Sequence, residues 1–502
     1  MQDRENISAL AAEDSITLYW DKKISGKARY RIFVNGDLHG ETEKTHYKLK
    51  FLEPEKKYQI RVEKTEGESG GILAEVWLST AKAKRKLDVT QVPYYAAGDG
   101  MTMNTDRIQR AIDDCGAEDA VYIPAGVFMT GALRLHSDME LYIAEGGVLQ
   151  GTDEVEDYLP RIWSRFEGTE RECYSSLLNL GNLDNGGGYN CRNVVIRGEG
   201  VIASGGQTLA RKVIESEQER LKEALAALQE KINEYEKPET VPGRGRPRLI
   251  NISNCQNIWI SGLTLKNGAS WNVHMIYSDG VVTEGCTFYS EGVWNGDGWD
   301  PDSSANCTIF NCTFFTGDDS IAIKSGKNPE DNQIGRPCKN IRIFDCRCTF
   351  GHGIAIGSEI SGGIEDIAIW DCDMSHSQFG IEIKATPKRG GYVRNVSVID
   401  SSTSRILFHS VGYNDDGIAA AAPPVFENCR FDQVRITGEA LNQNREWIAC
   451  EALELCGFDQ TGYELKNITC SNLVLGQPGK RRRQTIALEL CRNISFDNIR
   501  AF

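Results

Sequence analysis

The chain has 502 residues, of which 40% are hydrophobic and 25% charged, a composition that is typical of folded globular proteins and excludes extensive disorder. The net charge of −15 argues against a nucleic-acid partner, because binding to phosphates needs clustered lysine and arginine. No run of about 18 apolar residues occurs, so we expect no membrane partner either.

Sixteen cysteines and the start of the chain bear on the cellular compartment. The first residues, MQDRENISALAAED, lack the basic start and apolar core of a secretory signal. Thiols without an export signal favour a reducing compartment, in which they stay reduced and fill the core. We therefore expect a cytoplasmic protein, with a secreted or periplasmic mature form whose signal has been removed as the alternative.

Residues 1–83 are predicted to form a small β-sandwich, because short runs of alternating hydrophobicity are separated there by turn residues. The expected strands cover residues 15–20, 28–34, 47–49, 58–63 and 73–79. An early Trp20 and the pattern L-x-P-x-x-x-Y that ends at Tyr58 resemble a fibronectin type III domain with its tyrosine corner. The basic, unpatterned residues 82–86 are the expected linker.

Residues 88–502 repeat loosely, with an Asn-Cys, Asp-Cys or Gly-Cys turn at several of the short β-runs. Cys286, Cys312, Cys346 and Cys372, for example, follow one another at intervals of 26, 34 and 26 residues. Such a period predicts a right-handed parallel β-helix, in which stacked coils align their Asn and Cys positions as ladders. The competing leucine-rich repeat lacks its consensus here, so we expect an all-β fold.

Two segments have the period of a helix. Residues 209–236 alternate apolar and charged positions at helical spacing, which predicts a helical insertion over the solenoid or, as the alternative, a helix for a coiled-coil partner. Residues 105–115 form a shorter amphipathic pattern and are expected to cap the N-terminal end of the solenoid, whose apolar core would otherwise be open.

The densest polar clusters are residues 295–304, 317–326, 351–357 and 379–385. The last three have the same pattern, so Ile321, Ile354 and Ile381 should align in successive coils and face the core. The residues between and after these isoleucines then face outward, and they include Lys324, Glu382 and Lys384.

Asp297 and Asp318 lie 21 residues apart, close to one coil, and one coil advances only about 4.8 Å. We expect Asp297, Asp318 and Asp319 to share one patch, with His352 one coil further on. Carboxyl groups this close shift each other's pKa, so one stays protonated while another ionises, as acid–base cleavage of a glycosidic bond requires. Asp-Gly and Asp-Asp also close turns, but turns alone do not require this register.

Small residues accompany these side chains. We expect Gly317, Gly351 and Gly353 to let a sugar approach the backbone closely.

These motifs resemble glycoside hydrolase family 28, the polygalacturonase family. Its signatures N-T-D, D-D, G-H-G and R-I-K correspond here to residues 295–297, 318–319, 351–353 and 382–384. The likeness covers about residues 88–502, and the additional N-terminal domain resembles the bacterial exo-acting members.

The resemblance implies an inverting, exo-acting hydrolase of α-linked galacturonate in pectic oligo- or polysaccharides, which needs neither cofactor nor metal. Asp318 would be the general acid, while Asp297 and Asp319 hold and deprotonate water. His352 would tune the proton of the acid or contact the sugar, and Lys384 would pair with a uronate carboxylate. Neither the sequence nor the resemblance indicates a particular oligomeric state.

One position departs from the family pattern, because Glu382 replaces the arginine of R-I-K. A carboxylate there neutralises Lys384 and repels a uronate, whereas Lys324, Lys388 and Arg389 could restore positive charge. A rhamnogalacturonan or a substituted galacturonan, such as xylogalacturonan, is therefore the alternative substrate. From other classes, a calcium-dependent pectate lyase and a non-catalytic carbohydrate-binding solenoid stay open as alternatives.

Overall fold

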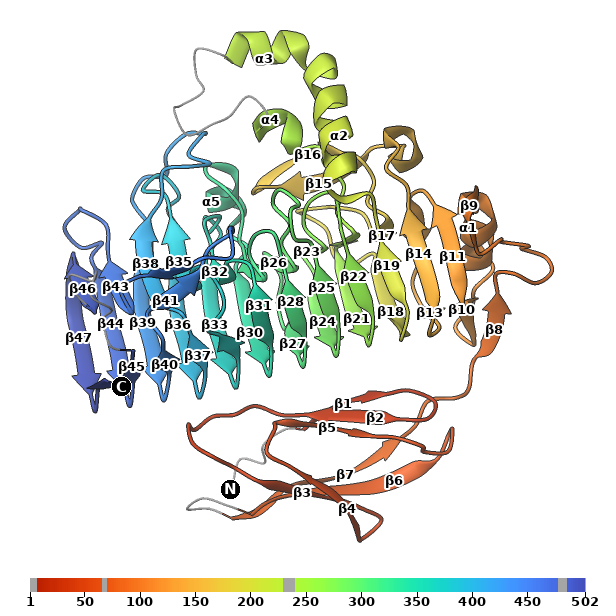
Figure 1. Ribbon diagram of the computed structural model, residues 1–502, viewed down its shortest axis with the longest axis horizontal. Coiled ribbons are helices and arrows are strands. Elements are labelled where there is room, and N and C mark those ends of the chain that lie inside the picture. The colour runs from red at the N-terminus through yellow and green to blue at the C-terminus, as the bar shows by residue number, and fades with distance from the viewer. Residues whose placement is uncertain (1–6, 66–69, 229–239, 477–484, 502) are drawn as a thin grey trace. The chain divides into compact units, whose positions relative to one another are not determined.

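The computed structural model describes residues 7–65, 70–228, 240–476 and 485–501. The chain divides into two compact units, Met1–Lys86 with Glu118–Ala120, and Leu87–Ala117 with Val121–Phe502 (Figure 1). Within the described ranges, no helix has the length and apolar character needed to cross a membrane.

The first unit contains two antiparallel sheets, as predicted, with the strand orders β1-β2-β5 and β4-β3-β6-β7. The strands are β1 (Ser8–Ala11), β2 (Ile16–Tyr19), β3 (Tyr30–Val34), β4 (Asp37–Thr42), β5 (His46–Leu49), β6 (Lys57–Lys64) and β7 (Gly71–Ser79). Strand β4 was not predicted, because its sequence DLHGET is polar and it lies exposed at a sheet edge. Strand β1 was also missed, since its four residues carry no clear alternation.

Trp20 and Tyr58 belong to the core of this unit. The backbone N–H of Glu53 donates a hydrogen bond of 2.9 Å to the Tyr58 hydroxyl, which ties the loop before β6 to the strand. This contact has the form of a tyrosine corner. Assignment to the fibronectin type III class stays a prediction.

Deletion of residues 1–83 is expected to leave residues 88–502 folded, because each unit has its own hydrophobic core. The truncated chain should keep the far-ultraviolet circular dichroism of a β protein and its catalytic activity. An insoluble chain, or one without β structure, would contradict this and make the sandwich part of the solenoid's fold.

The second unit is a parallel β-helix whose described strands form three long sheets of 13, 13 and 11 strands. Two sheets run from β8 (Arg85–Asp88) to β47 (Cys491–Asp497) and from β9 (Asp99–Met103) to β48 (Arg500–Ala501). The third sheet has the order β12 (Leu133–Leu135), β17 (Leu178–Leu180), β20 (Ile250–Ser253), β23 (Val273–Ile276), β26 (Trp299–Asp302), β29 (Ile321–Ile323), β32 (Gly353–Ile356), β35 (Gly380–Ala385), β38 (Ile406–Ser410), β43 (Leu453–Cys456) and β46 (Ile486–Glu489).

The predicted ladders are present at the turns of the coils. Asn257 donates its side-chain amide to Asn193 at 3.2 Å, and both residues have positive φ, a conformation that asparagine tolerates well. The Cys286 N–H points at the Cys312 sulfur in the next coil. All sixteen cysteines lie in the described ranges without a disulfide there, and all but Cys456 and Cys491 are buried, as predicted.

Helix α1 (Thr105–Asp113) buries Ile108, Ala111 and Ile112 in the solenoid core, which confirms the expected cap. The predicted helix over 209–236 is instead two helices, α2 (Gly206–Arg220) and α3 (Lys222–Leu228), because Leu221 leaves helical geometry. Residues 229–236 of that prediction lie outside the described residues. The apolar face of α2 joins the solenoid core through Leu209, Ala210 and Val213, so this helix is packed within its own chain.

The same insertion contains α4 (Thr240–Gly243), which packs on α2. Figure 1 shows these helices with the hairpin β15 (Ile162–Phe166) and β16 (Thr169–Cys173) at one edge of the solenoid, near β23 and β26. That edge is where the polar clusters of the sequence lie.

Candidate active site

Successive strands of the third sheet align the site residues by register. Ile321 pairs with Ile354, which pairs with Ile381, and all three are buried, as predicted. The neighbouring column holds Ala322, Ala355 and Glu382. This column was expected to face solvent, but Glu382 is only 3% exposed, because its carboxylate packs against Lys384 and His409.

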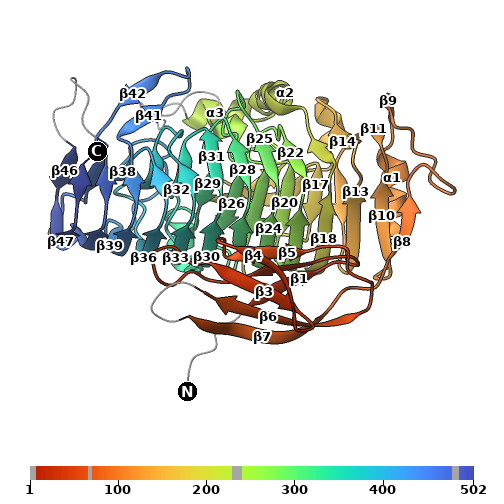
Figure 2. The ribbon, with the colours of Figure 1, turned by 60° about the horizontal axis from the view of Figure 1, so that its bottom comes forward.

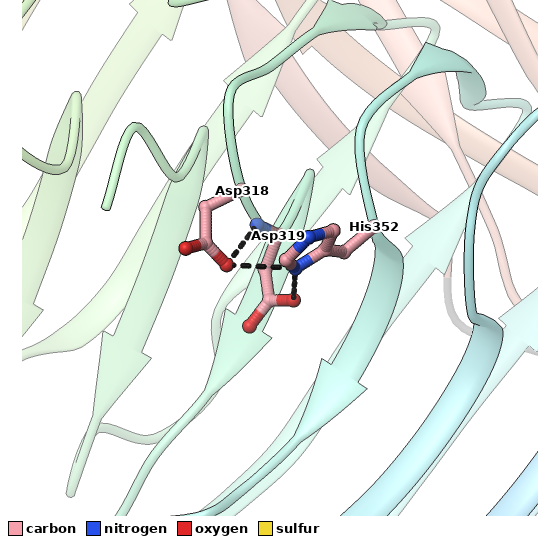
Figure 3. Close-up of side chains that lie close together, drawn as sticks. All are labelled: Asp318, Asp319 and His352. Carbon is pink, nitrogen blue, oxygen red and sulfur yellow. Dashed lines mark hydrogen bonds and ion pairs between the residues drawn. The ribbon is translucent and has the colours of Figure 1, made fainter. Parts of the chain in front are cut away.

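Asp318, Asp319 and His352 lie close together just before the first residues of β29 and β32 (Figure 3). The Nδ1 atom of His352 lies 2.9 Å from Oδ1 of Asp318 and 3.4 Å from Oδ1 of Asp319. The Asp319 N–H donates to Oδ1 of Asp318 at 3.0 Å, which fixes the two carboxyl groups in different directions. The Asp318 side chain is 25% exposed and that of Asp319 only 5%.

The glycines around this group are needed for packing within the chain. A Cβ atom on Gly351 would lie 2.2 Å from Oγ1 of Thr316, and one on Gly353 would lie 2.2 Å from the Gly380 carbonyl oxygen. One on Gly317 would lie 2.5 Å from the Val293 carbonyl oxygen. Close approach of a sugar to the backbone at these glycines stays a prediction.

Asp297 lies at a second cation, the buried ammonium group of Lys324. The Lys324 Nζ atom is 3.4 Å from Oδ2 of Asp297, 3.8 Å from Oδ1 of Asp300 and 3.9 Å from Oε2 of Glu359. The ring of Trp271 lies 4.8 Å from the same nitrogen. One lysine therefore lies close to three carboxyl groups from two segments of the chain.

The carboxyl groups have opposite ionisation states. Burial and the neighbouring Asp300 raise the pKa of Asp297 well above its usual value, against the attraction of Lys324. Burial raises the pKa of Asp300 to about 8. Burial also opposes the ionisation of Asp319, but Lys384 and His352 outweigh it and hold its pKa below the usual range. At neutral pH Asp300 therefore retains a proton and Asp319 is a carboxylate, while the raised pKa of Asp297 favours its protonated form.

His352 is charged over the same range. Burial disfavours the imidazolium ion, but the carboxylates of Asp318 and Asp319 outweigh it and raise the pKa of His352 to about 10. The ring thus carries two protons next to the most exposed of the three aspartates.

Lys384 and Glu382 form a buried pair with a second histidine. Lys384 Nζ lies 2.8 Å from Oε2 of Glu382 and 3.5 Å from Oδ2 of Asp319. His409 Nε2, one coil further on, lies 2.8 Å from Oε1 of Glu382. The ring of half-exposed Tyr413 is 6.0 Å from the Lys384 ammonium. Glu382 is therefore turned toward Lys384 and is not a loose surface residue.

The two downstream basic residues do not add charge next to Lys384. Arg389 is fully buried and donates to the backbone oxygens of Ser358 and Asn414. Lys388 pairs with Asp415 at 3.0 Å. Both hold loops in place.

The sequence did not single out several residues of this site. Asp300 and Glu359 lie within or near the polar clusters but have no matching signature. Arg246 comes from the insertion and donates to Oδ1 of Asn295 at 2.6 Å, two residues before Asp297. The sequence does not reveal this contact of Arg246, because it forms only when the insertion folds back onto the sheet.

Among the described residues, one group of carboxylate and imidazole atoms is close enough for a metal ion, that of Asp318, Asp319 and His352, within 4.8 Å of one another. Lys384 already supplies positive charge at Asp319, at 3.5 Å. A charged His352 has no lone pair to offer a metal. The group is therefore suited to proton transfer.

Comparisons with known proteins agree with this geometry. The family model of glycosyl hydrolases family 28 matches residues 187–416. An exo-poly-alpha-D-galacturonosidase of Dickeya chrysanthemi is 25% identical over 88% of this chain and 76% of its own, and a probable polygalacturonase of Vitis vinifera is 31% identical over 68% and 65%.

Solved structures extend the likeness. The family 28 exopolygalacturonase of Yersinia enterocolitica has a TM-score of 0.80 at 22% identity and covers 99% of this chain and 98% of its own. An exopolygalacturonase of Thermotoga maritima has a TM-score of 0.67 at 25% identity, over 83% of this chain and 91% of its own.

The family model and the named relatives identify the enzyme as a glycosidase that hydrolyses O-glycosyl bonds. Among such enzymes it is similar to glycosyl hydrolases family 28, whose model matches residues 187–416.

Proposed function

We propose that the protein is an inverting, exo-acting hydrolase that releases galacturonate from pectic oligo- or polysaccharides. The observation that carries the proposal is the convergence of ionised Asp319, proton-bearing Asp297 and the Asp318–His352 pair at one strand edge. Relatives named as exo-acting galacturonosidases support the substrate and the mode of attack.

Each residue has a role in a single displacement. The Nδ1 proton of His352 passes through the exposed Asp318, 2.9 Å away, to the glycosidic oxygen, so Asp318 is the general acid and the imidazolium supplies its proton. Asp297 holds a water molecule, and Asp319 accepts its proton as the water oxygen bonds to the anomeric carbon and the glycosidic C–O bond breaks. The attack from the opposite face inverts the anomeric centre.

Product analysis tests this proposal. Defined oligogalacturonides are incubated with the full-length protein, and the products are followed by mass spectrometry and proton NMR. Release of single galacturonate units, with the β-anomer as the first-formed product from an α-linkage, is expected. Products of mixed length argue against exo-action, retention of the α-anomer argues against inversion, and an unsaturated uronide identifies a lyase instead.

A second candidate substrate has a neutral sugar on the leaving-group side of the bond, as in rhamnogalacturonan or a substituted galacturonan. Glu382 favours it, because this carboxylate takes up the charge of Lys384 that would otherwise attract a uronate.

Glu382→Gln separates the two candidates, because it removes the negative charge and keeps the shape. With a uronate at this position, the KM for oligogalacturonides is expected to fall several-fold, since Lys384 then has one carboxylate fewer beside it. With a neutral sugar, the KM for a matched neutral-sugar oligomer is expected to rise. The KM for the oligogalacturonide should then fall relative to that of the neutral-sugar oligomer. If the KM values for both substrates respond equally, position 382 does not determine substrate specificity. The matched control is Glu365→Gln, which lies on another sheet.

A further inference from the structure

The hairpin of β41 (Glu439–Leu441) and β42 (Trp447–Ala449) lies outside the segment that matches the family model, residues 187–416. It leaves the solenoid after β40 (Arg435–Ile436) and returns to β43. Both Figure 1 and Figure 2 show it next to β38, at the edge of the solenoid that carries the active site.

The tip of this hairpin reaches the catalytic histidine. Nε2 of Gln443 lies 3.2 Å from Nε2 of His352, 91 residues earlier in the chain. The other ring nitrogen of His352 faces Asp318 and Asp319, so the imidazole is held between the two carboxyl groups and the hairpin. The ring of Phe379 packs edge-on against it, with centroids 4.8 Å apart.

A second contact ties the tip to the loop that precedes Asp297. The guanidinium of Arg445 lies 2.5 Å from Oε2 of Glu291 and stacks over Phe350, at 4.4 Å. Phe350 comes two residues before His352, and Glu291 begins the turn that ends at Asp297. The hairpin therefore touches two of the loops that carry the catalytic residues.

The tip itself is well defined by its own turn. The side-chain oxygen of Asn442 accepts the N–H groups of Asn444 and Glu446, both at 2.9 Å, and Arg445 has the positive φ of 60° that closes the turn. The Asn442 N–H donates to the Glu446 carbonyl oxygen at 3.0 Å. Gln443 is thus presented by a rigid turn and not by a loose chain.

We propose that this hairpin is part of the active site and that Gln443 is a positioning residue, which holds the His352 ring in the orientation that faces Asp318. The proposal rests on the hydrolase function given above. It adds a residue that acts through His352 and does not itself touch the reacting atoms.

The chemistry of an amide suits this role. A charged imidazole has N–H donors on both nitrogens, so Gln443 must then turn its amide oxygen toward Nε2. When His352 gives up its Nδ1 proton to Asp318, Nε2 keeps its own proton and still donates it to the amide oxygen of Gln443. Gln443 therefore supports the ring in both states of the proton cycle.

Three variants of the full-length protein test the proposal. Gln443→Ala removes the partner of Nε2 and is expected to lower kcat about tenfold with little change in KM. Gln443→Glu places a negative charge at the imidazolium and cannot donate once ionised, so the titration of His352 and the alkaline limb of the kcat profile should both move to higher pH. Asn444→Ala, in the same turn, is the control and should behave as wild type.

The His352 titration is measured by NMR of the imidazole signals, assigned with His352→Gln, and does not depend on any substrate. If Gln443→Ala changes kcat but neither Gln443 variant moves this titration, or if both match Asn444→Ala, the positioning role is wrong. Failure of the hydrolase function would instead leave the wild type inactive while the titration still responds to position 443.

Arg445→Ala provides an independent check, because it releases the tip without changing Gln443. The ion pair is exposed, so its loss should lower kcat only about two- to threefold. In the double variant with Gln443→Ala no further loss is expected, since both changes remove the same support of His352. Two fully multiplicative losses would show that the hairpin does not act through Gln443.

Discussion

Replacement of Asp318 by asparagine is expected to lower kcat by about 10²- to 10⁴-fold on oligogalacturonides while the fold is retained. The amide has the shape of the carboxyl group but cannot supply the proton that the leaving oxygen needs. The Asp318 side chain is the most exposed of the three catalytic aspartates, so its loss costs little packing. Kinetics and thermal unfolding of the same preparation provide the measurement.

A substrate with a good leaving group distinguishes the general-acid role of Asp318 from the role of a general base. An aryl galacturonide with an acidic phenol needs no protonation, so Asp318→Asn should recover most of its activity on it. Asp319→Asn should stay inactive on the same substrate, but azide, which attacks without losing a proton, should restore turnover. If Asp319→Asn and not Asp318→Asn responds to the phenol, the acid and base are assigned the wrong way round.

Replacement of Lys324 by methionine is expected to abolish measurable activity and to destabilise the fold by about 3–5 kcal/mol, because buried carboxyl groups lose their cation. Asp297, Asp300 and Glu359 all lie within 3.9 Å of the Lys324 ammonium. Lys339→Met, at an exposed position of β30 (Cys338–Phe344), is the matched control and should change stability by less than about 0.5 kcal/mol.

The destabilisation by Lys324→Met should depend on pH. Burial opposes ionisation of Glu359, but Lys324 and Arg389 lower its pKa, so this pair stabilises the fold at neutral pH and loses its effect as the pH falls. Asp300, whose pKa is raised to about 8, and Asp297, whose pKa is also raised, take up protons at a higher pH than Glu359 and then need no cation. The difference in stability between variant and wild type should therefore shrink from pH 8 to pH 4, and a constant difference would exclude the electrostatic cause.

Sequence reasoning located the strands of the site because a β-helix has a simple rule of register. Once Ile321, Ile354 and Ile381 are aligned, every neighbour in the same strands is placed as well. The proximity of Asp318 to His352 follows from the same spacing.

What could not be predicted depends on segments that leave the coils and return. Whether Glu382 faces solvent depends on which other residues pack against it, and the alternation of residues along a strand carries no information about that packing. Arg246 and Gln443 reach the site from an insertion and a hairpin, whose direction is set by turns and contacts distant in sequence.

The separate sheet of hairpin β41–β42 has a consequence for heating. Strands β41 and β42 pair only with each other among the described strands, whereas β29 and β32 each have neighbours on both sides in the third sheet. A two-stranded hairpin is marginally stable by itself and opens more easily than strands inside a large sheet. Local opening would thus withdraw Gln443 before it disturbs the aspartates, so a warmed enzyme should change its pH dependence before it stops working.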